Sequence, residues 1–161
     1  MPATQISAPT KFTARGTSKV YWVPTIANYA SPSRAELNAG TDLSRAVTDS
    51  GGWSVATEQI EAPSLADRYT PTVPGSISAE ESSLTCFASR QGVDARALMP
   101  RDAAGFIVWL DGGDIASNKM DVYPVTVSSV SKQRQVRGGD PDTLVISYAI
   151  TDVPAENVTV P

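Results

Sequence analysis

The chain has 161 residues, of which 19% are charged and 41% belong to the hydrophobic class, and its formal net charge is −4. This length suits one domain with a substantial core, and the composition is typical of a soluble globular protein. A protein that holds nucleic acid by neutralising phosphates needs clustered Lys and Arg in excess. The acidic balance therefore argues against stable nucleic-acid binding.

The available side-chain chemistry is restricted because the chain has no histidine and a single cysteine, Cys86. These counts remove zinc-type ligand sets, the usual general base, and both Ser-His-Asp and Cys-His nucleophile pairs. A single cysteine also excludes an intramolecular disulfide, so a reducing cytoplasm is the expected place of synthesis. What remains is carboxylate chemistry, hard-cation binding by Asp and Glu, or no chemistry at all. We expect the last of these, with no enzyme activity, no catalytic residue, no cofactor and no metal.

The N-terminal region predicts an extended arm over residues 1–18, which are rich in Thr, Ala, Ser and Pro. It lacks the charged and apolar segments of a leader, and no later segment approaches the length of a membrane span. We expect a protein that is made and used in solution, with residues 19–161 forming a single β domain.

The first two elements of that domain have clear signals. Residues 19–23 (KVYWV) are β-branched and aromatic, which predicts a strand with two apolar faces. A short helix is predicted over residues 32–39, because serine, proline and glycine stand at its N-cap, first and exit positions. Ser33 and Glu36 also have capping-box spacing, so a start two residues later is a second possibility.

Residues 24–74 are predicted to form a long loop region that contains this helix and one further strand. Turn-forming residues fill 41–52, with one helical turn embedded. Alternation at 53–58 predicts the strand, and Pro63 ends this run. Three prolines in 62–74 favour an extended connection over the interior of a sheet. Loops this long are usually functional or disordered.

Further strands are predicted over residues 75–87, 105–110, 119–131 and 143–152. The run at 105–110 (GFIVWL) is apolar on both faces, which indicates burial on both sides or in an interface. In the strand at 119–131, Pro124 requires an edge position or a bulge.

Between these strands the sequence predicts a helical turn over residues 93–98, a tight turn at 111–114 and a polar connection at 132–142. The pattern amounts to about six strands and one short helix. We therefore expect a mainly β fold, a β-sandwich or partial barrel, with one short α-helix and a long inter-strand loop.

Four segments resemble a known family. They are MPRDAAGFIVWLDGG (99–113), KMDVYPVTVSSVSKQR (119–134), VISYAITDVPAENVTVP (145–161) and SPSRAELNAGTDL (31–43). These segments resemble the major tail tube proteins of long-tailed, siphovirus-type bacteriophages that infect actinobacteria. The resemblance covers most of residues 19–161, and it rests on packing and turn residues rather than on a catalytic signature.

The resemblance implies a structural subunit of the virion tail, assembled in the cytoplasm of the host bacterium. Its fold would be similar to that of type VI secretion tube proteins, with copies forming stacked, hexameric rings around a channel for DNA. The implied partners are other copies, the tape measure protein, and the terminator and tip proteins of the tail. DNA would be a passenger, and no membrane is involved. The loop region 24–74 would reach adjacent subunits, and the terminal arms would tie rings together.

Seven polar residues are candidates for the wall of such a channel. A tube that passes DNA without retaining it should present hydroxyl and acidic groups rather than cations or apolar side chains. The candidates are Glu80, Glu81, Ser83, Thr85, Thr143, Ser147 and Thr151. An ordinary solvated sheet face produces the same alternation, so this explanation remains open.

Five further residues are candidates for contacts between subunits. They are Lys132, Arg134, Arg137, Trp22 and Trp109. A solvated or salt-bridging hairpin loop is the simpler explanation of the three basic residues. Packing in a core or an interface is a commoner role of tryptophan than a ligand platform.

Two other classes of function remain open beside the tube. A carbohydrate-binding β-sandwich module would bind glycans through exposed tryptophans. A carboxylate-dependent hydrolase, or a calcium site, would use aspartates such as Asp111, Asp114, Asp140 and Asp142. Turn formation is the simpler explanation of these aspartates, because Asp and Gly together are what tight hairpins require.

Overall fold

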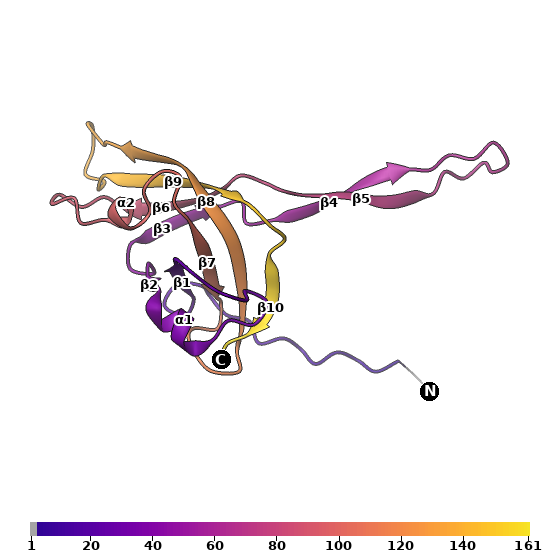
Figure 1. The fold of residues 1–161 in the computed structure, drawn as a ribbon, viewed down its shortest axis with the longest axis horizontal. Helices are drawn as coiled ribbons and strands as arrows, with labels where there is room; N and C mark the ends of the chain where they lie inside the picture. Colours follow the sequence, from indigo (N-terminus) through magenta and orange to yellow (C-terminus); the bar gives the residue numbers. More distant parts are fainter. Residues whose placement is uncertain (1–2) are drawn as a thin grey trace.

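The computed structural model describes residues 3–161, which fold mainly into antiparallel β-structure (Figure 1). The main sheet contains, in chain order, β1 (Lys19–Val23), β2 (Thr41–Asp42), β3 (Val47–Gly51), β6 (Ser82–Phe87), β7 (Ala104–Leu110), β8 (Lys119–Gln133), β9 (Thr143–Ile150) and β10 (Ala155–Thr159). A separate sheet consists of β4 (Val55–Glu61) and β5 (Thr72–Ala79), and the helices are α1 (Arg34–Ala39) and α2 (Ala95–Leu98).

The main sheet curls into a partial barrel. Its strand order is β2-β1-β7-β8-β9-β6-β3, and β10 pairs with β8 beside this path. Although β2 and β3 stand at opposite ends of the order, only residues 43–46 connect them. Within this connection the amide of Leu43 donates to the carbonyl of Val20 in β1, and the carbonyl of Ala46 accepts from the amide of Phe87 in β6. The connection therefore joins the two ends of the sheet, and the predicted mainly β fold is confirmed.

Two apolar clusters lie on the two sides of this sheet. In β1, Val20 and Trp22 belong to the cluster inside the barrel, whereas Tyr21 and Val23 belong to the outer cluster that also includes Leu37 of α1. Strand β7 divides its side chains in the same way. The two runs predicted to be apolar on both faces are therefore buried on both faces, because a second layer covers the outside of the barrel here.

Helix α1 begins at Arg34 because Ser33 caps it. The hydroxyl of Ser33 accepts from the amide of Glu36 at 3.3 Å, and the carboxylate of Glu36 accepts from the amide of Ser33 at 2.7 Å. This capping box confirms the later of the two predicted starts. The amide of Ala27 also donates to Glu36 at 2.7 Å, and it is the first of the hydrogen bonds that lower the pKa of this carboxyl.

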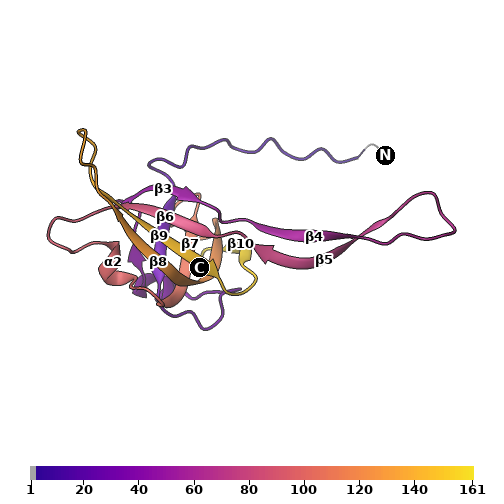
Figure 2. The same ribbon diagram turned by 90° about the horizontal axis from the view of Figure 1, so that it is seen from above.

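In the second half of the predicted loop region over residues 24–74, the strand predicted from residue 53 is confirmed by β4, but the prediction of loop around it is wrong. Strand β3 pairs with β6, and β4 pairs with β5 in a long antiparallel ribbon that extends away from the barrel (Figures 1 and 2). We call residues 55–79 the projecting hairpin. Pro74 lies inside β5, opposite Gln59. A two-stranded ribbon tolerates proline because each strand has an unpaired edge, and local sequence does not reveal that property.

The single strand predicted over residues 75–87 is in fact two strands. Glu80 and Glu81 separate β5 from β6 and form the bend where the projecting hairpin returns to the barrel. At Gly52, which has a φ of +76°, an added Cβ would lie 2.5 Å from the carbonyl oxygen of Glu81. The outgoing chain thus passes so close to the bend that only glycine fits there.

Strand β8 is central to the sheet, although it contains Pro124. One side pairs with β7, and the other pairs with β9 from Val125 onward and with β10 up to Val122. Pro124 lies where the partner changes, and its carbonyl accepts from the amide of Thr151 on that side. The missing N–H of proline therefore falls at a local break in the ladder, and an edge strand is not needed.

The C-terminal strands contrast in how well sequence predicts them. In β9, Leu144, Ile146 and Tyr148 alternate as expected, and all three are fully buried. Strand β10 was not expected, because its sequence (AENVT) lacks apolar alternation and includes Asn157 with a φ of 58°. The predicted helical turn at 93–98 is confirmed by α2.

Candidate functional site

The outer side of β3, β6, β9 and β8 presents small and hydroxyl-bearing side chains. The β6–β9 register places Ser83 opposite Ser147 and Thr85 opposite Val145, and β8 extends the first of these rows by placing Ser129 opposite Ser147. We call this surface the hydroxyl face. Its members are Asp49, Gly51, Ser83, Thr85, Ser129, Ser131, Gln133, Thr143, Val145, Ser147 and Ala149, with Phe87, which is 45% exposed, at the Thr143 end.

Four of the seven residues predicted for a channel wall lie on the hydroxyl face: Ser83, Thr85, Thr143 and Ser147. The other three lie beside it. Thr151 follows the end of β9, and Glu80 and Glu81 belong to the bend before β6 rather than to a strand. The chain must turn from the hairpin into the barrel at this bend, so the regular alternation on which their placement relied does not extend to them.

The hydroxyl face contains no lysine or arginine. Asp49, on the edge strand β3, is its one charged member. Lys132 lies close to it on β8, but its ammonium pairs with Asp142 at 3.8 Å. A surface of hydroxyl groups and carboxylates forms no ion pairs with phosphates, so it would not hold a nucleic acid that moves across it.

The three tryptophans are packed within the subunit. Trp22 is 4% exposed, and its ring lies so close to Gly105 that an added Cβ would be 2.5 Å from it. Trp22 is therefore not available for the predicted contact with a neighbouring subunit. Trp53 packs edge-on against Trp109, with 5.9 Å between ring centroids, and against Tyr123 at 5.2 Å. Since none of these rings is exposed, the carbohydrate-binding alternative loses its predicted platform.

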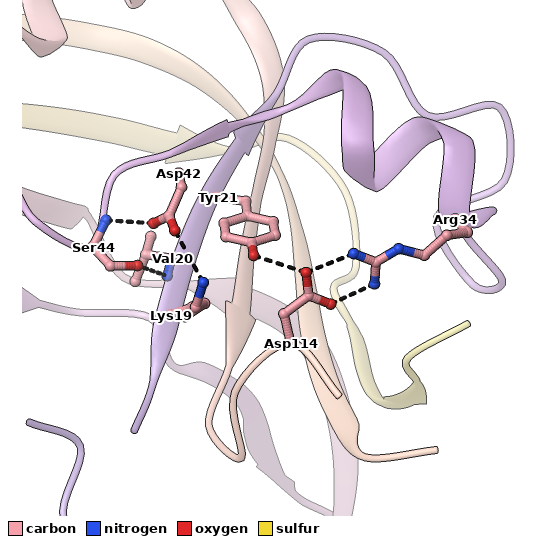
Figure 3. A network of polar contacts seen from close by, with 7 residues as sticks. All are labelled: Lys19, Val20, Tyr21, Arg34, Asp42, Ser44 and Asp114. Carbon is pink, nitrogen blue, oxygen red and sulfur yellow. Dashed lines mark hydrogen bonds and ion pairs between the residues drawn. The ribbon is translucent and has the colours of Figure 1, made fainter. Parts of the chain in front are cut away.

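Asp114 fastens α1 to the turn between β7 and β8 (Figure 3). Its carboxylate accepts from both terminal nitrogens of the Arg34 guanidinium, with 2.6 Å between Nη2 and Oδ2, and from the hydroxyl of Tyr21 at 2.9 Å. The Arg34 guanidinium, assisted by Tyr21, holds the pKa of Asp114 below its usual range. Sequence reasoning favoured a turn role for Asp114. Its contact with Arg34 could not be predicted, because the two residues are 80 positions apart in the sequence.

The remaining aspartates serve turns and ion pairs. Asp142 accepts from the amide of Gln135 at 3.0 Å in addition to its pair with Lys132. Burial, followed by the charge of Asp121, raises the pKa of Asp111. Across residues 3–161 no group of three or more carboxylate or thiol side chains is placed to hold a metal ion. Over the same range, neither helix has the length and apolar character that crossing a membrane requires.

Two exposed surfaces have the composition of contact sites. Arg134 and Arg137, both exposed, take part in none of the ion pairs formed within residues 3–161. The projecting hairpin exposes large apolar side chains along its length and at its tip, namely Ile60, Leu65, Tyr69, Val73 and Ile77. Sequence reasoning missed these residues, although the alternation at 55–61 and 72–79 was a signal for them.

The described residues combine a mainly β partial barrel, a face without cations and a projecting hairpin with exposed apolar side chains. The family model described as phage tail tube protein matches residues 6–161. The chain therefore belongs to the phage tail tube protein family, whose members are structural, non-enzymatic components of the virion tail.

The solved structures give an independent comparison of the fold. A chain in the cryo-EM structure of the anti-feeding prophage baseplate, which was 6-fold symmetrised, is similar with a TM-score of 0.56 at 10% sequence identity. The alignment covers 91% of this chain and 95% of that chain. At this identity the likeness concerns the fold alone. No curated protein matches the chain.

Proposed function

We propose that this chain is the repeating subunit of a siphovirus-type tail tube, in which copies form rings and the rings stack around a channel for DNA. The observation that carries the proposal is the hydroxyl face, where the register sets Ser83, Ser147 and Ser129 in one row across three strands. Such a wall offers phosphates no cation to bind, so DNA passes without being retained.

The number of copies in each ring is part of the proposal. The similar baseplate structure is described as 6-fold symmetrised, which supports six copies per ring. The proposed partners are the tape measure, terminator and tip proteins of the tail, with assembly in the cytoplasm of an actinobacterial host. These partners and the host follow from the resemblance described above. The hairpin and the exposed arm at residues 3–18 are the segments that reach adjacent subunits.

Assembly itself is tested by negative-stain electron microscopy of the purified chain, alone and with the initiating proteins of the tail. The expected result is rings or long tubes with a central channel. A chain that stays monomeric at high concentration in the presence of those partners would contradict the proposal, because the tube depends on self-association.

The orientation of the hydroxyl face is tested by labelling Ala149→Cys, an exposed position on this face. In the free subunit, a small maleimide and a polymer-linked maleimide should both react. In assembled tubes only the small reagent should react, because the polymer does not enter a narrow channel. Equal reaction with both reagents would place this face on the outside of the tube, and loss of both reactions would place it in an interface. The native Cys86 is fully buried and gives no background.

A further inference from the structure

The exposed apolar side chains of the chain are concentrated in two regions outside the arm. One is the projecting hairpin with its tip, where Tyr69 is 77% exposed. The other is formed by residues 88–98, which include α2, and the connection at 132–142; there Val93 is 81% and Val136 is 91% exposed. We call this second region the basic end. Large exposed apolar groups that gather in one region mark surfaces that another molecule covers.

The charges of these two regions are opposite. The projecting hairpin contains three carboxylates and one arginine, and the bend that follows it adds Glu80 and Glu81. The basic end contains five cations and three carboxylates. Of these three carboxylates, Asp94 caps α2 and pairs with Arg96, and Asp142 pairs with Lys132. Within residues 3–161, no ion pair involves the carboxylates of the hairpin. The unpaired charges are thus mainly negative in the hairpin, and mainly positive in the basic end, where Arg90, Arg134 and Arg137 outnumber Asp140.

The two regions cannot meet within one subunit. The amide of Ala88 donates to the carbonyl of Asp142 at 3.0 Å, so the two parts of the basic end lie together. Both views place them at the end of the barrel opposite to the projecting hairpin (Figures 1 and 2). Any contact between these regions must therefore join two copies, and it leaves one free hairpin and one free basic end to continue the assembly.

We propose that the projecting hairpin of one copy docks on the basic end of the next, with Leu65 and Tyr69 packed against Val93 and Val136. The carboxylates of Glu58 and Glu61 then face Arg134 and Arg137 at the margin of the contact, where paired charges select partner and orientation. This inference rests on the proposed tube, and it assigns the chemistry and direction of one of its contacts. Because exposed charge pairs are screened by salt, assembly weakens as ionic strength rises.

Charge reversal in two chains tests the pairing. The first chain carries Arg134→Glu with Arg137→Glu, and the second carries Glu58→Lys with Glu61→Lys. For each chain alone, the protein concentration needed for assembly should rise at least about tenfold, because like charges now face each other. An equal mixture should assemble at nearly the wild-type concentration, since every contact between the two chains joins opposite charges. Arg45→Glu, a reversal at an exposed site outside both regions, should assemble as the wild type does.

The outcomes separate this inference from the proposed tube. If the wild type assembles and either reversed chain assembles equally well, or if the mixture of folded variants is not rescued, the docking is overturned and the tube stands. If the wild type forms no ring or tube even with its initiators, both are overturned. Circular dichroism of each variant establishes that it is folded.

Cross-linking locates the contact directly. A mixture of Tyr69→Cys and Val136→Cys chains should form a disulfide-linked dimer on oxidation of the assembled sample. The control replaces Val136→Cys with Ile115→Cys, which is also exposed but lies outside the basic end, and it should give no dimer. Equal dimer yields from the two mixtures would overturn the docking. Cys86 is fully buried, and burial raises the pKa of its thiol to about 11, so it does not compete.

Discussion

The barrel and the projecting hairpin are built from similar residue types but differ in what stabilises them. In the barrel, Leu84, Ile146 and Tyr148 are fully buried by strands from both ends of the sequence. In the hairpin, no residue of β4 or β5 is fully buried, and Ile77 is 56% exposed. A two-stranded ribbon alone is marginally stable in water. The barrel therefore has a packed core within one subunit, whereas the hairpin has little packing of its own, and in the proposed assembly a neighbouring copy supplies it.

The largest effect is expected for Ile146→Ala, which removes buried apolar volume from the centre of the barrel. The free energy of unfolding should fall by about 2–5 kcal/mol, because the transfer free energy is lost and a cavity remains. Chemical denaturation of the free subunit measures this change. A loss below about 1 kcal/mol would mean that the barrel core relaxes around the cavity, and the contrast with the hairpin would weaken.

A smaller effect is expected for Gly105→Ala in β7. The added Cβ would lie 2.5 Å from the ring of Trp22, which is held by the barrel core and has no space to move. Overpacking of this kind costs about 1–3 kcal/mol. Thermal or chemical denaturation checks the value, with Gly139→Ala as the control, because nothing lies within 4 Å of a Cβ there. Equal stability of the two variants would contradict the tight packing of Trp22.

The third prediction concerns the pH dependence of the barrel. The folded-state pKa of Asp114 is lowered by Arg34, so its ionised form stabilises the fold above the unfolded pKa, about 3.9. This contribution is lost as the pH falls through the lower, folded-state pKa. Asp114→Asn should therefore be less stable than the wild type at neutral pH, by less than the core variants are, and the difference should shrink on acidification.

Denaturation from pH 7 down to pH 2 measures this prediction for Asp114→Asn and for Asp140→Asn, which changes an exposed aspartate outside any ion pair within residues 3–161. The control should follow the wild type. A constant difference between Asp114→Asn and the wild type at every pH would show that shape, not charge, stabilises this contact.

The smallest effect is expected for Ile77→Ala in the projecting hairpin. Because this side chain is exposed, the free subunit should lose no more than about 0.5 kcal/mol. Hydrogen exchange adds a second measurement: amides of β4 and β5 should exchange faster than those of β6 and β9 in the free subunit and become protected on assembly. Slow exchange of the hairpin in the free subunit would contradict its dependence on a neighbour.

Several features of the fold follow from local sequence. The period-2 pattern of β9 and the capping box of α1 act over a few residues, so both were predictable. Four residues of the hydroxyl face were also predictable, because alternate positions on one strand share a face. The absence of histidine and the single cysteine argue against most enzyme mechanisms on composition alone, because the side chains that such mechanisms need are missing.

Other features depend on contacts between distant residues, and tertiary structure alone decided them. Pairing of β6 with β9 created the continuous face that neither strand has alone, and the contact of Arg34 with Asp114 joined residues eighty positions apart. The projecting hairpin was misjudged because prolines exclude a strand only from the interior of a sheet, and whether a strand has an unpaired edge depends on its neighbours. Residue patterns thus determined strands with a packed apolar face, such as β1 and β9, while non-local pairing determined the remaining strands and which surfaces the protein presents.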